Sequence, residues 1–143
     1  MVFRTLSAGL LAASVAAFGA AAQDADAKFS LELNNAANTD TGGCRLTYVA
    51  TNRSGQDLAK TDYQVGVFNA EGVVTRILVL GFGALTNGKT RIVLFDLGDQ
   101  SCTDISRIIV NDVAECTLAD GQPAGFCLTG LVTSSRTEVQ FGI

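Results

Sequence analysis

Short apolar segments alternate with clusters of turn residues along most of the chain. The segment 29–33 alternates apolar and polar residues strictly, which is typical of a β-strand with one buried face. Further apolar segments predict strands at 44–51, 63–68, 73–80, 90–97, 105–110 and 137–141. No segment has a long helical period, and the stretch 119–128 is expected to form a short helix or an irregular loop.

Turn residues separate these predicted strands. The segment 69–72 (Asn-Ala-Glu-Gly) predicts a tight hairpin turn, and 86–89 contains the Asn-Gly pair that favours turns. The segment 34–43 is polar and predicts a loop. About seven short strands with a turn roughly every ten residues predict an all-β protein built as an antiparallel β-sandwich.

The first 22 residues have the pattern of a cleavable secretory signal peptide. Arg4 gives a basic start, the run from Leu6 to Phe18 is uncharged, and small residues at 20–22 precede the expected cleavage point. A membrane-spanning helix needs roughly 20 apolar residues, so a cleaved signal is favoured over an anchor. We therefore expect residues 23–143 to form one domain that is periplasmic or secreted, with no membrane span after cleavage.

Four cysteines follow the predicted cleavage point, at Cys44, Cys102, Cys116 and Cys127. An even number of cysteines in an exported protein predicts two disulfides, for which three pairings are possible. We favour Cys116–Cys127, because the turn-rich segment 120–123 between them closes a local loop easily, and this leaves Cys44–Cys102 as a long-range cross-link. Without a Cys-x-x-Cys pair, a metal site or a redox-active pair is disfavoured.

Composition and charge exclude several classes of function. The chain has 10 basic and 14 acidic residues, and the charges are interspersed, whereas nucleic-acid binding requires basic clusters. The complete absence of histidine rules out a Ser-His-Asp triad and a Cys-His pair, and it removes the usual zinc ligand. The sequence therefore predicts no catalytic residue, no metal ligand, no cofactor and no nucleic-acid partner.

Four acidic residues, Asp96, Asp99, Asp104 and Asp112, bracket Cys102. Carboxylates in one stretch can bind calcium, which takes oxygen ligands. Their spacing does not match an EF-hand loop, so we favour solvated acids, some of which cap turns.

Four arginines, Arg45, Arg76, Arg91 and Arg107, lie in or next to predicted strands. Arginines on the outer face of a strand commonly pair with acids on the neighbouring strand. The alternative is a patch that binds an anionic ligand.

Two further polar motifs are expected to be structural. Ser134 and Ser135 would need a lysine as base to act as nucleophiles, so we predict a polar connection before the last strand. The segment 52–54 (Asn-Arg-Ser) matches a glycosylation sequon, but turn chemistry is the favoured interpretation.

Three motifs between Cys44 and Leu97 are shared with a known class of domain. One strand ends in Thr-Asn-Arg-Ser (51–54), a hairpin follows at 67–72, and the segment 80–88 leads to a strand ending in Phe-Asp-Leu (95–97). In these motifs the segment resembles the immunoglobulin-like modules of bacterial envelope proteins, such as the FxLYD-type domains. The resemblance covers a little under half of the chain after cleavage and implies an Ig-like sandwich.

A second resemblance extends over the whole chain after cleavage. It rests on the segment 44–47 (Cys-Arg-Leu-Thr), on 95–97, on Cys102 and on 107–111 (Arg-Ile-Ile-Val-Asn). In these residues the chain is similar to short, uncharacterised periplasmic proteins of alphaproteobacteria, some of which are labelled as having twin-arginine export signals. This chain has only Arg4 in its export segment, so the general secretory route is expected. The resemblance implies no known activity.

These observations favour an exported periplasmic accessory or protein-interaction module without catalytic activity, whose partner is another envelope protein. Exposed sheet edges and loops would provide its contact surface. One alternative is a ligand-binding or structural envelope protein, which would contain a large enclosed apolar pocket. A less favoured alternative is a carboxylate-based hydrolase, which needs two acids about 5–10 Å apart in one cleft.

Overall fold

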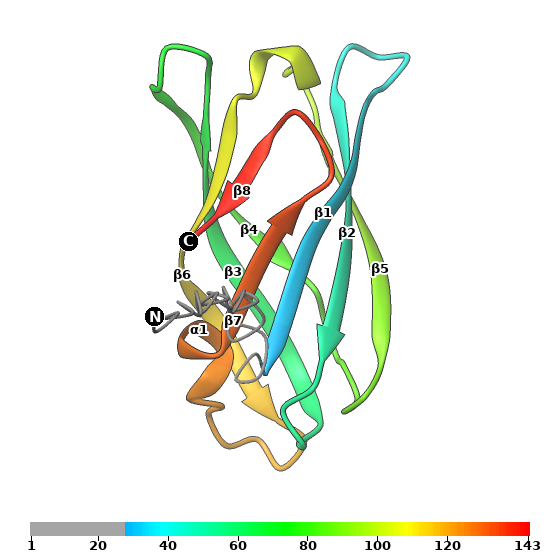
Figure 1. Ribbon diagram of the computed structural model, residues 1–143, viewed down its shortest axis with the longest axis vertical. Coiled ribbons are helices and arrows are strands. Elements are labelled where there is room, and N and C mark those ends of the chain that lie inside the picture. The colour runs from blue at the N-terminus through cyan, green and yellow to red at the C-terminus, as the bar shows by residue number, and fades with distance from the viewer. Residues whose placement is uncertain (1–27) are drawn as a thin grey trace, which may run out of the picture.

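Eight strands form two sheets that pack face to face in the computed structural model, which describes residues 28–143 (Figure 1). In chain order the strands are β1 (Phe29–Asn38), β2 (Cys44–Asn52), β3 (Leu58–Phe68), β4 (Val74–Gly81), β5 (Thr90–Leu97), β6 (Arg107–Leu118), β7 (Leu131–Ser135) and β8 (Gln140–Gly142). A 3-10 turn, η1 (Cys102–Asp104), precedes β6, and a one-turn helix, α1 (Phe126–Thr129), precedes β7. The predicted signal peptide lies outside the described residues.

The all-β sandwich predicted from the strand pattern is confirmed. Sheet A has the strand order β5-β2-β1-β7, and sheet B has the order β4-β3-β6-β8. Most neighbouring strands are antiparallel, but β7 lies parallel to β1 and β8 lies parallel to β6. These two pairings bring the last strands of the chain to one lateral edge, where β7 and β8 contact each other.

The strand boundaries differ from the sequence-based prediction in several places; β6, for example, continues to Leu118, whereas a strand was expected at 105–110. β1 continues through Asn38 into the segment 34–43, which was expected to be a loop, because its backbone keeps pairing with β2 after a bulge. β3 begins at Leu58, earlier than expected. β7 contains Ser134 and Ser135, so the prediction of a connecting loop there was wrong. Strands pair through backbone hydrogen bonds, which do not require apolar side chains. The apolar pattern therefore missed these segments.

One apolar core lies between the two sheets. In β1 and β2 alternate positions are almost completely buried, from Phe29 to Leu33 and from Cys44 to Ala50. Aromatic rings join the sheets at the centre, where Tyr48 packs edge-on against Phe82 with the ring centroids 5.7 Å apart. Burying one side chain of this size contributes about 1.5–3 kcal/mol. This core determines which face of every strand points outward.

Both predicted turns form at glycines with positive φ. The N–H of Gly72 donates to the carbonyl of Asn69, and the N–H of Lys89 donates to the carbonyl of Thr86, each at 3.0 Å. Gly72 and Gly88 have φ values of 77° and 76°, which side-chain-bearing residues rarely adopt. The first turn joins β3 to β4 within sheet B, whereas the second precedes β5 and leads the chain into sheet A.

Both favoured disulfide pairings are confirmed. Cys44–Cys102 links the start of β2 to η1, across 58 residues of chain. Cys116–Cys127 links β6 to α1, across 11 residues. The predicted short helix at 119–128 forms only at its end, as α1. Because two disulfides persist only in an oxidising environment, they indicate an extracytoplasmic location.

The other lateral edge of the sandwich is formed by β4 and β5. Each is the end strand of its sheet, opposite the end that β7 and β8 occupy. The chain connects β4 directly to β5, and a bridge between Leu58 and Leu85 holds this connection against β3. The sandwich therefore has one edge with two short strands and one edge with two eight-residue strands.

Candidate functional site

The four acids around Cys102 do not form a cation site. Asp96 lies on β5 and Asp112 on β6, where the Asp112 carboxylate accepts a hydrogen bond from the next backbone N–H at 2.7 Å. Only Asp99 and Asp104 line the same surface depression. Within residues 28–143, no group of three His, Cys, Asp or Glu side chains is arranged to hold a metal ion.

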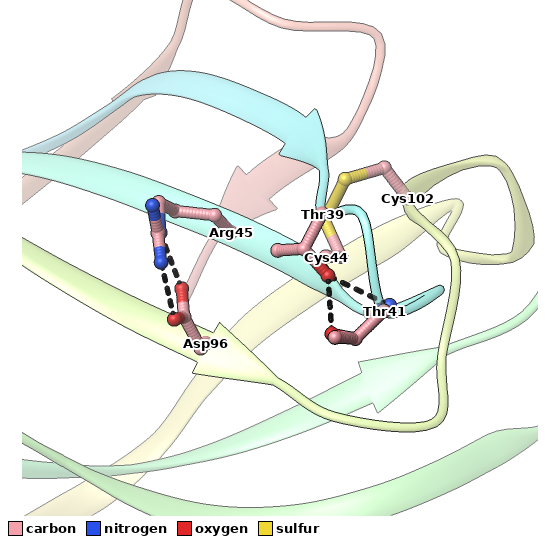
Figure 2. Close-up of polar contacts among 7 residues, drawn as sticks. Thr39, Thr41, Cys44, Arg45, Asp96 and Cys102 are labelled. Atoms are coloured by element: carbon pink, nitrogen blue, oxygen red, sulfur yellow. Dashed lines mark hydrogen bonds and ion pairs between the residues drawn. A yellow bond between two sulfur atoms is a disulfide. The ribbon is translucent and has the colours of Figure 1, made fainter.

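Arg45 and Asp96 form a bidentate ion pair across β2 and β5 (Figure 2). Arg45 Nε lies 2.6 Å from Asp96 Oδ1, and Arg45 Nη2 lies 2.7 Å from Asp96 Oδ2. The hydrogen bonds from Arg45 lower the pKa of Asp96 below its ordinary value. This pair confirms the predicted cross-strand pairing for Arg45. Both side chains are half-exposed, so solvent screens their attraction and the pair adds little to the stability of the fold.

The same view shows how the neighbouring loop is held (Figure 2). The disulfide Cys44–Cys102 lies at the start of β2, next to the turn in which the hydroxyls of Thr39 and Thr41 are 3.1 Å apart. Thr39 Oγ1 also accepts the backbone N–H of Gly43 at 3.0 Å. These contacts use the polar groups of the loop to hold its own conformation.

The remaining strand arginines do not converge on an anion site. Arg76 Nη2 donates to the carbonyl of Gly98 at 2.7 Å, and Arg91 Nη1 donates to the carbonyl of Ala84 at 3.2 Å. Neither guanidinium forms an ion pair with a carboxylate of the described part of the chain. Arg107 lies over an aromatic ring on the outer face of sheet B. The four arginines therefore do not form the anion-binding patch considered from the sequence.

Asn52 confirms that the sequon segment is a turn. Its side chain is fully buried, and Nδ2 donates to the carbonyls of Gln56 and Leu85, both at 2.8 Å. Its Oδ1 accepts the backbone N–H and the hydroxyl of Ser54. The amide nitrogen that a glycan would modify is thus enclosed and already bonded twice.

The serine pair has no nucleophilic arrangement. Ser134 is exposed on β7. The hydroxyl of Ser135 donates to the carbonyl of Val139 at 2.7 Å and lies 3.1 Å from the hydroxyl of Thr137. These bonds hold the turn between β7 and β8, and no lysine is among the partners of Ser135.

One surface depression of about 440 Å³ gathers three carboxylates, those of Glu71, Asp99 and Asp104. All three residues are exposed. An acid-base pair needs its two carboxyl groups in different environments, with one of them in an apolar pocket. The depression does not supply this difference, so it offers little support for the hydrolase alternative.

Large aliphatic side chains on β4 and β5 point into solvent. On β4, Ile77 and Val79 are 66% and 53% exposed, and we call them the β4 row. On β5, Ile92 and Leu94 are 65% and 56% exposed, and we call them the β5 row. The intervening residues of both strands point toward the core, so the two strands are apolar on both faces. Natural edge strands are usually protected by charges, bulges or short length.

The β4 row continues onto the outer face of sheet B. Ile77 lies opposite Gly66 of β3, and Gly66 in turn lies opposite Ile109 of β6. A Cβ at Gly66 would be 3.6 Å from the side chains of both Ile109 and Phe68. The side chains of Ile109 and Phe68 therefore cover the backbone of Gly66 beside the β4 row.

The β5 row has fewer apolar neighbours than the β4 row. Ile92 lies opposite Val49 of β2, and Leu94 lies opposite Thr47. Both β2 residues are half-buried. The β5 row thus stands at the margin of sheet A, with a polar residue beside Leu94.

Charge along this edge is basic on balance. β4 and β5 together contain Arg76, Arg91 and a single acid, Asp96. Asp96 is engaged by Arg45. The chain as a whole carries a net charge of −4. The apolar rows are therefore accompanied by guanidinium groups in a protein that is otherwise acidic.

The sequence-based prediction placed strands at 73–80 and 90–97 but did not identify the exposed rows. The signal was present, because 73–80 and 90–97 contain nearly continuous apolar runs instead of strict alternation. Such runs are typical of strands covered on both faces. The structure covers only one face of each, which leaves the other as the candidate binding surface.

Comparisons with known proteins do not add an identity. The chain matches no family model, and it matches no curated protein and no solved structure. Within residues 28–143, no helix is long and apolar enough to cross a membrane.

Proposed function

We propose that this chain is an exported, non-catalytic interaction module of the bacterial periplasm, which binds another envelope protein through the β4–β5 edge. The observation that supports this most strongly is the exposure of four large aliphatic side chains, Ile77, Val79, Ile92 and Leu94, on the two strands of one edge. Exposed apolar surface of this kind is typical of a protein-interaction site.

These side chains are large enough for their burial by a partner to stabilise a complex. Complete burial of one Ile, Leu or Val side chain contributes about 1.5–3 kcal/mol. A partner that covers either row also provides backbone groups to pair with an edge strand, which otherwise leaves them to solvent. The edge therefore offers both apolar area and directional hydrogen bonds.

Export of the chain has two supports. The predicted signal peptide at 1–22 directs the protein out of the cytoplasm, and two disulfides fit an oxidising compartment. An Ig-like sandwich is consistent with the motif resemblance between Cys44 and Leu97. Together these support an envelope location for the proposed interaction.

A ligand-binding envelope protein is less well supported. The depression beside Cys102 with the most apolar lining is about 260 Å³ and includes Ala36 and Val139. Small-molecule sites usually enclose about 300–1,000 Å³. This depression is smaller than that range and open to solvent, whereas the edge rows are accessible along their full length.

Site-specific photo-crosslinking in the cells that export the protein tests this proposal. A photoreactive amino acid at Ile77 or Ile92 should form covalent adducts with the same partner in repeated preparations. The same amino acid at Ser134 or Gln140, which are exposed at the opposite edge, should not. Equal adducts from both edges, or no adduct from any position, would refute an interaction at the β4–β5 edge.

A further inference from the structure

Among the edge strands of residues 28–143, β5 is the most regular and the least protected. It lies at the end of sheet A, and its pairing with β2 runs from Thr90↔Thr51 to Leu97↔Cys44 without a register shift. By contrast, the pairing of β4 with β3 contains a shift, and the edge strands β7 and β8 have five and three residues. An eight-residue edge strand without proline or register shift is a template for another strand.

Two features of β4 make it a poorer template. Thr75 accepts a hydrogen bond from the side chain of Gln100, and Arg76 bonds to the carbonyl of Gly98. The segment that follows β5 therefore lies against the beginning of β4. Among the described residues, no segment lies against the central part of β5 in this way. The one comparable bond runs from the Arg91 side chain to the carbonyl of Ala84.

The charges near β5 select the chemistry of the added strand. Arg91, at the start of β5, uses one N–H on a carbonyl and pairs with no carboxylate in residues 28–143. Arg76, on the neighbouring edge strand, instead lines the depression that also holds Glu71, Asp99 and Asp104, so acids already lie beside it. Asp96, the one acid of β5, is already bound by Arg45 in two hydrogen bonds. The edge thus offers unmatched positive charge and complements a segment that has carboxylates.

We propose that β5 accepts an extended, carboxylate-bearing segment of a partner protein as a fifth strand of sheet A. This inference rests on the proposed function and names the strand, the binding mode and the class of partner. Apolar residues on one side of the segment pack on the β5 row, Ile92 and Leu94. A carboxylate on its other side lies toward Arg91.

A second copy of the chain is a poorer match for this edge. Antiparallel pairing of two β5 strands on a two-fold axis can place Ile92 opposite Leu94 of the other copy, which suits the apolar row. It brings the same unmatched arginine from each copy, however, and adds no free carboxylate, because Asp96 is bound by Arg45. Charge complementarity therefore favours a different, acidic segment.

A synthetic strand provides a defined probe. We would titrate the disulfide-bonded protein with a blocked eight-residue peptide in which Val and Glu alternate, and follow the backbone amides by NMR. Saturable shifts confined to β5 and its neighbour β2 are expected. Two control peptides separate the contributions: one alternates Val and Gln, and the other is the Val-Glu peptide with N-methyl groups at alternate residues. Each control should bind at least about tenfold more weakly, because one lacks charge and the other lacks strand hydrogen bonds.

Matched protein variants locate the site. Ile92→Gln with Leu94→Gln should abolish binding of the Val-Glu peptide, whereas Ile77→Gln with Val79→Gln should leave it within about twofold, because those side chains lie on the other sheet. Arg91→Gln should weaken binding severalfold and reduce its dependence on salt. Arg107→Gln, at an exposed arginine on β6 of the other sheet, should change neither quantity.

Several outcomes would overturn the inference. Undiminished binding of the N-methylated peptide excludes strand addition, and loss of binding only in the Ile77/Val79 variant moves the site to β4. A concentration-dependent dimer that the Ile92/Leu94 variant abolishes identifies a second copy as the occupant. If a partner crosslinks at Ile92 but the Val-Glu peptide neither binds nor competes with it, this inference fails while the proposed function stands. If no position of the edge crosslinks a partner, the proposed function fails as well.

Discussion

Two buried tyrosines differ in what their hydroxyl groups contact. The hydroxyl of Tyr63 donates to the carbonyl of Cys127 at 2.6 Å, and this bond holds α1 against sheet B. The hydroxyl of Tyr48 is buried without a hydrogen-bond partner in the described part of the chain. Burial raises the pKa of both phenols above the ordinary value. Both hydroxyls are therefore neutral at physiological pH, and only one of them is bonded.

This difference predicts that replacing each tyrosine by phenylalanine changes the free energy of unfolding by different amounts. Tyr63→Phe leaves the carbonyl of Cys127 without its partner and should lower the free energy of unfolding by about 1–2 kcal/mol. Tyr48→Phe removes an unsatisfied buried hydroxyl at nearly constant shape, so the free energy of unfolding should stay within about 0.5 kcal/mol or rise. Urea unfolding of the two variants provides the comparison. Equal losses in both would show that Tyr48 is also hydrogen-bonded.

At the residue scale, the sequence allowed turn chemistry to be predicted but not the buried polar contacts. The turns at 69–72 and 86–89 follow from local Asn and Gly preferences, which do not depend on the rest of the fold. The bonds of Asn52 to Leu85 and of Tyr63 to Cys127 join residues 33 and 64 positions apart. Such pairs are determined by how the sheets pack, and no local pattern marks them.

At the scale of the strands, alternation located the core-forming segments and failed at the edges. β1 and β2 were predicted because their inward residues form regular apolar rows. β7 was missed because it is short and lies at an edge, parallel to β1, where polar residues such as Ser134 are tolerated. The rows on β4 and β5 were missed for the opposite reason. Their outward side chains are apolar, so the sequence did not distinguish the exposed face from the buried one.

Ion pairs between strands make stability depend on pH. The pKa of Asp96 is lowered by its bonds to Arg45, and the pKa of Glu32 is lowered by hydrogen bonds from Asn34 and Arg136. A carboxyl group with a lowered pKa in the folded state stabilises the fold above its unfolded-state pKa, about 3.9 for Asp and 4.3 for Glu. That stabilisation is lost as the pH falls through the folded-state value. The contribution of these two carboxyl groups to the melting temperature should therefore be constant above about pH 5.5. Below about pH 4 the melting temperature should fall.

The variant Asp96→Asn with Glu32→Gln provides the check. It lacks both groups, so its melting temperature should fall less steeply than that of the unmodified protein between about pH 5 and pH 2.5. Asp40→Asn is the matched control, because Asp40 is exposed and forms no ion pair among residues 28–143. Parallel melting curves for the double variant and the unmodified protein would show that the two ion pairs do not stabilise the fold.

At the scale of the whole molecule, the architecture followed from strand number and cysteine count, while the sheet order did not. Predicting seven strands and two disulfides was enough to predict a sandwich. The partner of each strand depends on contacts between distant segments. After β4, for example, the chain crosses to the other sheet, where β5 pairs with β2. This crossing makes both apolar strands the end strands of their sheets, at the same lateral edge of the sandwich. The candidate binding surface is therefore a property of the topology, which composition and periodicity do not reveal.

The two disulfides should differ in how much they stabilise this topology. A cross-link restricts the unfolded chain more when it closes a longer loop. Cys44–Cys102 closes a loop of 58 residues between the start of β2 and η1, whereas Cys116–Cys127 closes one of 11 residues between β6 and α1. On the loop-entropy relation, the free energy of unfolding should fall by about 4 kcal/mol for Cys44→Ala with Cys102→Ala and by about 3 kcal/mol for Cys116→Ala with Cys127→Ala.

Urea unfolding of both double variants, compared with the unmodified protein before and after reduction, measures these losses. The denatured state of the variant without Cys44–Cys102 should also expand more, which increases the dependence of the unfolding free energy on urea concentration. A larger loss for Cys116–Cys127 would mean that its native contacts outweigh loop entropy, since Cys127 also presents the carbonyl that Tyr63 binds. In that case the Cys116–Cys127 disulfide between β6 and α1 would stabilise the sandwich more than the long-range Cys44–Cys102 disulfide does.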